Sequence, residues 1–332
     1  KLFSWWWMQT DALFERWARA YPATETSGDL KASPEDFVVV EQANYAEDSD
    51  EQATGEHLYL LLQKRNQTTR ELVRSVADAN AIPISSIGYA GMKDKHAVTQ
   101  QWVSVPIGNE GTGSADVAVP EDALELRRVR QTKKLRRGWH DGNLFEIVLR
   151  RVTGATSEQL DTRLQQIAQH GVPNYFGQQR FGTDNLDQAI AWLPRRRRER
   201  NAFKRGLHLS VLRSFLFNEV LSSRIANGTW NTPLEGEASP EGPLWGRGRV
   251  QASEAVIEFE RSALEEHMSI AGELEFAGLN QERRALVLHP QNLSWSQPDS
   301  ESVRLEFGLL PGCYATSMLR ELGQFSQTER VT

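Results

Sequence analysis

Apolar residues recur three or four positions apart in several parts of the chain, and this spacing predicts helices with one buried face. One helix begins with a capping box, the pattern in which Thr68 and Glu71 satisfy each other's backbone N–H groups, and Pro83 stops it. Further helices are expected at residues 13–21, 158–170, 207–225 and 254–266.

Runs of β-branched and large apolar residues predict strands between these helices. Polar or glycine-punctuated stretches separate them and are expected to be loops. Strands and helices do not alternate regularly, which favours an α+β fold over a doubly wound parallel sheet. The expected strands are 37–41, 56–63, 101–105, 144–150, 285–288 and 303–307, and the expected loops are 43–55, 87–96, 109–114 and 231–248.

The composition is that of a globular protein, with 39% apolar and 25% charged residues. A length of 332 residues predicts two domains. The single cysteine, Cys313, excludes an internal disulfide and fits a reducing compartment, so we expect a cytoplasmic protein. No apolar run is long enough for a membrane span, and residues 2–8 are too short an apolar stretch for a secretory signal.

Charge is distributed unevenly along the chain. The formal net charge is −6, yet residues 127–137 carry +7 and residues 195–205 carry +6, which leaves −19 for the rest. Two basic blocks on an acidic background are typical of a protein that binds a polyanion. For either block alone, a solvated charged face is an equally good interpretation.

A glycine-punctuated loop at residues 87–96 holds the strongest candidate for chemistry. Asp94 lies between Lys93 and Lys95. Neighbouring cations favour the ionised form of a carboxylate, and an ionised carboxylate can act as a nucleophile. A surface turn with local ion pairs is the alternative. Motifs for ATP, dinucleotides, a serine nucleophile or a metal are absent, so we expect neither a nucleotide cofactor nor a metal.

Two further segments combine amides with aromatic residues. In the first, Asn143 and Phe145 stand at the entry of a predicted strand. An amide can pair with the edge of a base and an aromatic ring can stack on it, although a turn followed by a core phenylalanine fits as well. The second, NYFGQQRFG at 174–182, is compatible with close approach to RNA and with an aromatic junction between helices.

Read together, these segments resemble the TruD family of tRNA pseudouridine synthases. They occur in the family's order between about residues 30 and 322, and the first 25 residues lie outside the resemblance. The matching segments are PEDFVV at 34–39, GEH at 55–57, AGMKDKHAVTQQW at 90–102, KLRRG at 134–138, GNLF at 142–145, residues 172–182, RSFLFN at 213–218 and LPGCYATS at 310–317.

The resemblance implies roles for particular residues. Asp94 would be the catalytic aspartate, by direct attack on the ribose or by assisting a glycal-type elimination. Tyr314 stands where relatives can have Phe, and its hydroxyl needs a partner. Substrate-binding roles are implied for Phe37, Lys93, Asn143, Phe145 and Tyr314. We expect RNA contacts from the basic residues Lys133, Lys134, Arg136, Arg137, Arg180, Arg196 and Arg197.

The resemblance also implies a fold and a function. The expected fold is α+β: a pseudouridine synthase catalytic domain with a mixed β-sheet and helices, residues 1–169 and 290–332, interrupted by an inserted α/β TRUD-type domain at 170–289. Such a chain would isomerise uridine 13 of tRNA to pseudouridine as a monomer without a cofactor. Two alternatives stay open: a non-catalytic tRNA-binding or tRNA-folding protein on this scaffold, and a pseudouridine synthase that acts on another RNA.

Overall fold

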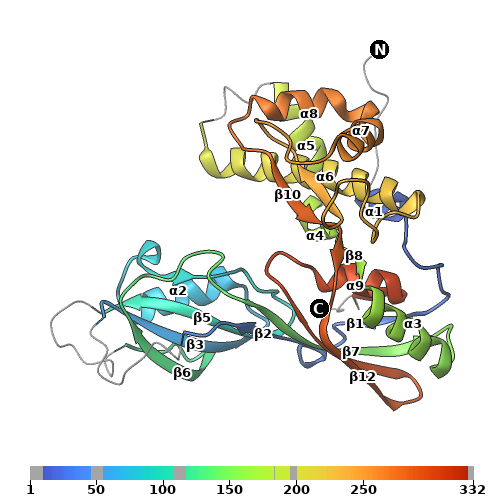
Figure 1. Cartoon of the computed structure of the whole chain (residues 1–332). Coiled ribbons are helices and arrows are strands. Elements are labelled where there is room, and N and C mark those ends of the chain that lie inside the picture. Colours follow the sequence, from blue (N-terminus) through green and yellow to red (C-terminus); the bar gives the residue numbers. More distant parts are fainter. Residues whose placement is uncertain (1–9, 46–54, 108–116, 183, 195–199, 328–332) are drawn as a thin grey trace. The chain divides into compact units, whose positions relative to one another are not determined.

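The computed structural model describes residues 10–45, 55–107, 117–182, 184–194 and 200–327 (Figure 1). The chain divides into two compact units. The sheet unit consists of Glu25–Gln159, Pro290–Gly312 and Gln324–Thr332. The helical unit consists of Lys1–Thr24, Leu160–His289 and Cys313–Gly323. The boundaries predicted for an inserted domain, at residues 170 and 289, stay a prediction.

The described part of the sheet unit contains a ten-stranded sheet whose main path runs β12-β13-β7-β2-β5-β3-β6. Neighbouring strands are antiparallel, except that β2 runs parallel to β5 and β1 parallel to β14. Its strands are β1 (Ser27–Leu30), β2 (Phe37–Gln42), β3 (His57–Arg65), β4 (Gly88–Tyr89), β5 (Val98–Pro106), β6 (Ala123–Gln131), β7 (Gly142–Thr153), β12 (Gln291–Asp299), β13 (Ser302–Leu309) and β14 (Gln324–Gln327). A mixed sheet with helices confirms the α+β fold class.

The helix α2 (Thr69–Ala79) covers one face of this sheet, across β3 and β5 (Figure 1). Its predicted capping box is present, because the Thr68 hydroxyl accepts the Glu71 N–H at 3.1 Å while the Glu71 carboxylate accepts the Thr68 N–H at 2.7 Å. The apolar face packs Leu72 and Val76 into a cluster that includes Leu60. The loop before β5 is thereby held between a capped helix and a buried strand.

The helical unit is built around α6 (Ala202–Ala226), which is buried along most of its length (Figure 1). Its buried residues face several directions, as expected for a helix in the centre of a core. The other elements are α1 (Thr10–Arg16), α3 (Ser157–His170, largely in this unit), α4 (Gln178–Phe181), α5 (Asn185–Trp192), α7 (Glu254–Ala263), α8 (Met268–Glu275), α9 (Ala315–Leu322) and the antiparallel pairs β8 (Val172–Pro173) with β11 (Val287–Leu288) and β9 (Glu241–Leu244) with β10 (Glu282–Ala285).

Each predicted helix and strand has a counterpart, but the strand predicted at 285–288 is divided between β10 and β11, and β4 lies in the loop predicted at 87–96. The first helix ends at Arg16 instead of continuing to residue 21, and β9 lies in the segment expected to be a loop at 231–248. Several short or polar elements were not expected, among them β1, β12, β14, α5, α8 and α9. Among the described helices, none has the length and apolar character of a membrane span.

Candidate active site

Asp94 lies in the loop that joins β4 to β5 in the sheet unit. The backbone of this loop is anchored on α2, because the N–H of Lys93 donates to the Thr69 hydroxyl at 2.8 Å. The Asp94 side chain remains 42% exposed. A rigid frame of buried strands therefore presents a carboxylate that solvent, or a substrate, can reach.

The cations that contact Asp94 come from elsewhere in the sequence. The Lys31 ammonium lies 3.3 Å from Asp94 Oδ1, and 4.2 Å from the centre of the Phe37 ring. The Lys64 ammonium donates to the Asp94 backbone carbonyl at 2.9 Å. Burial lowers the pKa of Lys64 to about 8, and the nearby Asp94 charge opposes this shift. Lys31 pairs with the side chain and Lys64 holds the backbone in place.

Lys93 does not pair with its sequence neighbour Asp94, although the sequence interpretation treated it as a flanking cation. Its ammonium turns into the sheet, 2.6 Å from Glu41 Oε2, and the two side chains are 4% and 0% exposed. It also donates to Asn143 Oδ1 at 2.8 Å. The buried Glu41 carboxylate neutralises the charge of the Lys93 ammonium. It also accepts a hydrogen bond from the Trp102 N–H at 3.2 Å.

This contact determines how Asn143 can act on a ligand. Asn143 stands opposite Glu41 in the β2–β7 pairing and is half-buried. Because its carbonyl oxygen accepts from Lys93, the amide group has a fixed orientation with the N–H₂ directed away from the ammonium. The residue is thus prepared to donate hydrogen bonds to a carbonyl, such as those of a uracil ring.

The aromatic candidates Phe37 and Phe145 lie side by side on β2 and β7. Their ring centres are 6.1 Å apart in an edge-to-face arrangement, and Phe145 stacks on Phe307 of β13 at 5.4 Å. Phe37 is 2% exposed and Phe145 is 7% exposed. The rings form a continuous apolar layer, with Lys31 placed over Phe37.

The predicted basic residues between β6 and β7 fall into two groups. Lys133 and Arg136 are exposed. The Lys134 ammonium donates to the Ser85 carbonyl, and Arg137 donates to the Tyr89 hydroxyl at 3.0 Å. Lys133 and Arg136 are available for phosphates. Arg137 is exposed as well, but it is tied to Tyr89 of β4, and Lys134 is tied to the short 3-10 turn that precedes β4.

Two predicted residues, Arg180 and Tyr314, meet in the helical unit. Arg180 donates to the Tyr314 hydroxyl at 3.0 Å and to the Ser210 hydroxyl at 3.0 Å. Its guanidinium carbon lies 5.6 Å from the centre of the Phe176 ring, on which Arg284 also stacks at 4.3 Å. The hydroxyl that distinguishes Tyr314 from a phenylalanine therefore has a partner. Arg196 and Arg197 lie outside the described residues.

The segment at 174–182 shows the packing that one of its two interpretations expected. Tyr175 is 1% exposed and stacks on Trp17, with ring centres 5.8 Å apart. Asn174 donates to the Ala285 carbonyl at 2.8 Å, and Phe181 is 1% exposed. Most of its aromatic residues belong to the core of the helical unit. Arg180 keeps a half-buried position at its edge.

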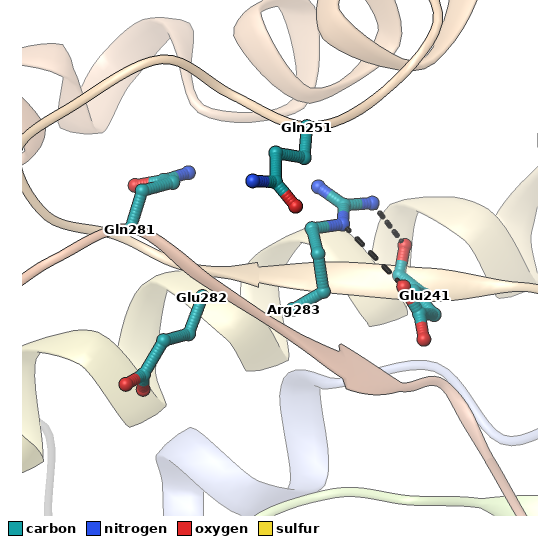
Figure 2. A pocket seen from close by; sticks show the side chains of 5 residues that line it. All are labelled: Glu241, Gln251, Gln281, Glu282 and Arg283. Atoms are coloured by element: carbon teal, nitrogen blue, oxygen red, sulfur yellow. Dashed lines mark hydrogen bonds and ion pairs between the residues drawn. The ribbon is translucent and has the colours of Figure 1, made fainter.

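A separate pocket of about 490 Å³ opens in the helical unit (Figure 2). It contains none of the predicted site residues. Arg283 is bound on one side by Glu241, whose carbonyl accepts at 2.7 Å, and contacts Glu260 at 2.6 Å. The pocket is lined by Glu241, Gln251, Gln281, Glu282 and Arg283. Among the described residues, no group of three or more His, Cys, Asp or Glu is placed to hold a metal ion.

Sequence reasoning missed three charged residues of the sheet unit, and for two of them a signal existed. Glu41 shares a face of its strand with the buried Phe37 and Val39. Lys64 likewise continues the buried face of β3. A charge in phase with a buried face must find a partner, which marks both positions. Lys31 carries no comparable signal, because it follows the short strand β1 and lies outside any strand pattern.

Comparisons with known proteins agree with this fold. A family model described as tRNA pseudouridine synthase D (TruD) matches residues 18–192 and 234–322. The tRNA pseudouridine synthase D of Cellvibrio japonicus (strain Ueda107) is 40% identical over 311 residues, which cover 92% of this chain and 91% of that protein. The protein of the same name from Xanthomonas campestris pv. campestris (strain B100) is 36% identical over 358 residues, with 94% and 96% covered.

A solved structure is similar as well. The crystal structure described as the putative tRNA pseudouridine synthase D (TruD) from Methanosarcina mazei superposes with a TM-score of 0.67, covering 92% of this chain and 95% of that one. At 21% sequence identity this likeness concerns the fold.

Proposed function

The chain belongs to the TruD family of tRNA pseudouridine synthases, and on that premise we propose that it isomerises uridine 13 of tRNA to pseudouridine with Asp94 as the catalytic aspartate. The observation that carries the proposal is the exposed Asp94 carboxylate, which lies beside Lys31 in a loop anchored on α2. The family match supports the pseudouridine synthase activity. The choice of Asp94 and of position 13 is our proposal.

The reaction needs few groups. It breaks the bond between N1 of uracil and C1′ of ribose, turns the base, and forms a bond between C5 and C1′. The proton on C5 leaves and N1 gains one, so no oxidant, reductant or energy source is consumed. A single carboxylate is enough to begin, either by attack on C1′ or by taking a ribose proton in a glycal route. Asp94 is suited to both because its carboxylate is accessible.

The remaining residues of the site suit the handling of a base. Asn143, oriented by Lys93, offers N–H donors to a uracil carbonyl. The layer of Phe37 and Phe145 gives an apolar floor. A target base must leave its stack in the folded tRNA, which requires such a surface and edge contacts. Tyr314 stays a predicted contact of the same base.

The tRNA backbone would be bound by basic residues. Lys133 and Arg136 are exposed next to the candidate site in the sheet unit. Phosphate contacts of this kind make affinity fall as salt rises. The second basic block, with Arg196 and Arg197, lies in the part of the chain that the family model does not match, and we propose that it contacts the tRNA backbone as well.

The proposal is tested by incubating the purified chain with unmodified tRNA transcripts, without added cofactor, and mapping pseudouridine. We expect product at position 13 and none in a matched transcript with cytidine at that position. Product at other positions, or only in other RNAs, would favour a synthase of different specificity. Tight binding without product would favour the tRNA-folding alternative.

A further inference from the structure

A tryptophan with no role so far follows the basic residues of the segment between β6 and β7. Trp139 is 40% exposed. The guanidinium carbon of Arg136 lies 5.6 Å from the centre of its ring, so that a cation covers part of the indole. Exposing the apolar surface of an indole ring to water is unfavourable. The exposed ring, which lies among exposed cations, is accessible to a planar partner.

The segment that carries Trp139 is fixed on both sides to the candidate active site. The N–H of Gly138 donates to the carbonyl of Ala90, the first residue of the Asp94 loop, at 2.8 Å. The N–H of Asp141 donates to the Gln42 carbonyl at 2.8 Å, at the end of the strand that carries Glu41. Gly138 has a φ of +83°, a conformation that suits glycine.

The anchors on either side keep Trp139 from moving into the core. Leu135 is 2% exposed in a cluster with Ala90 and Trp102, so the interior at this position is filled by another residue. His140, on the other side of Trp139, is half-buried. Its ring carbon Cε1 lies 3.7 Å from the position that a Cβ atom would occupy at Gly91. Trp139 is therefore presented on the surface beside the loop that holds Asp94.

We propose that Trp139 stacks on the nucleotide next to the target uridine and replaces the stacking that this neighbour loses when the uridine is extruded. This inference rests on the proposed function. Extruding a base leaves its neighbours without a stacking partner, and an aromatic side chain restores the contact with any base because every base has a π-face. Arg136, on the same ring, places a positive charge where the adjacent phosphates would lie.

Stacking and phosphate contact predict different dependence on salt, which separates the two roles. We would measure the affinity for an unmodified tRNA transcript by filter binding at several NaCl concentrations. Trp139→Ala and Trp139→Leu should each weaken binding about tenfold at every concentration, with the slope of log affinity against log salt unchanged. Trp139→Phe should recover most of the loss. Arg136→Gln should lower the slope by about one.

The matched control is Leu124→Ala, which removes another exposed apolar side chain of the sheet unit, 57% accessible on β6, and should bind as the wild type does. A second measurement places 4-thiouridine on either side of the target and maps photo-crosslinks, which should include Trp139.

The inference would be overturned if Trp139→Leu bound tRNA with wild-type affinity. It would also be overturned if Trp139→Ala lowered both the affinity and the slope of log affinity against log salt. Because affinity and pseudouridine formation are measured separately, failure of the proposed function shows as a wild-type chain that binds tRNA without product. Failure of the stacking role shows as unchanged affinity of the Trp139 variants, whether or not product forms.

Discussion

Carboxylates meet cations in both units of the molecule, but the two arrangements differ in what is left for a ligand. In the sheet unit, Asp94 contacts Lys31 at 3.3 Å and keeps 42% of its side chain exposed. In the helical unit, Glu260 contacts Arg283 at 2.6 Å, with side chains 3% and 13% exposed. The first carboxylate has free directions for a substrate, while the second is enclosed by its own partner.

The difference shows why the pocket in Figure 2 is not the better candidate for chemistry, although it is rich in charge. Its arginine is bound to Glu241 and Glu260 and stabilises the fold around it. The sheet unit combines both arrangements: the buried pair of Lys93 and Glu41 holds the frame, and Asp94 stands outside it. The buried Glu41 carboxylate thus stabilises the frame that presents the exposed Asp94 carboxylate.

The largest effect on stability is expected from breaking that enclosed pair. Lys93→Met leaves the Glu41 charge without a counter-ion, which should lower the free energy of unfolding by about 3–5 kcal/mol. It should also remove the hydrogen bond that orients Asn143, so that activity falls even where the chain is folded. Urea unfolding and turnover of the same variant measure the two effects.

The control for this prediction is the double variant Lys93→Met with Glu41→Gln. The amide removes the buried charge but keeps an acceptor for the Trp102 N–H, so part of the lost stability should return. A single Lys93→Met variant as stable as the wild type would show that the pair contributes little to this frame.

The pH dependence of stability probes the enclosed carboxylate of the helical unit. Burial raises the pKa of Glu260 from 4.5 to about 7, against the lowering effect of Arg283. Between these values the folded chain holds a proton that the unfolded chain has lost, so the free energy of unfolding should fall as pH rises from about 5 to about 7. The contribution is at most about 3 kcal/mol.

Glu260→Gln should remove this part of the pH dependence, because the amide does not titrate. Urea unfolding at about pH 5, 6 and 7 compares the slopes of the variant and the wild type. If both chains lose the same stability over this range, Glu260 is not the group responsible.

A smaller effect is expected at Tyr314, where the helical unit is predicted to act on substrate. Tyr314→Phe keeps the ring and removes the hydroxyl that accepts from Arg180, while Arg180 retains Ser210. Stability should fall by about 1 kcal/mol. The KM for tRNA should rise about threefold with kcat unchanged, because only the position of the ring changes. A tenfold loss in kcat would instead assign the hydroxyl to the chemistry.

Local signals made much of the fold predictable. The capping box at Thr68 is a contact between residues three apart, so the start of α2 could be read directly. The β-branched run at 37–41 placed β2, and strong apolar runs placed β3, β5, β7 and β13. Polar strands such as β12 and β14 were missed because their stability comes from pairing with neighbours, which a local pattern does not contain.

The candidate site shows the same division. Asp94 could be singled out from its loop and from the family resemblance, and Asn143 and Phe145 followed in the same way. The sequence order suggested that Lys93 would accompany Asp94, whereas in the folded chain Lys31 contacts Asp94 and Lys93 contacts Glu41. Which cation meets which carboxylate is decided by tertiary contacts.

The most direct test of the account is pseudouridine formation by Asp94→Asn under single-turnover conditions with tRNA. The amide keeps the size of the side chain and removes its charge. We predict a loss of at least about a thousandfold in rate, with tRNA affinity within about threefold and the free energy of unfolding within about 0.5 kcal/mol of the wild type. Glu306→Gln, at another exposed carboxylate of the sheet unit that pairs with Arg304 at 2.9 Å, should react normally. Product formed by Asp94→Asn at the wild-type rate would contradict the account.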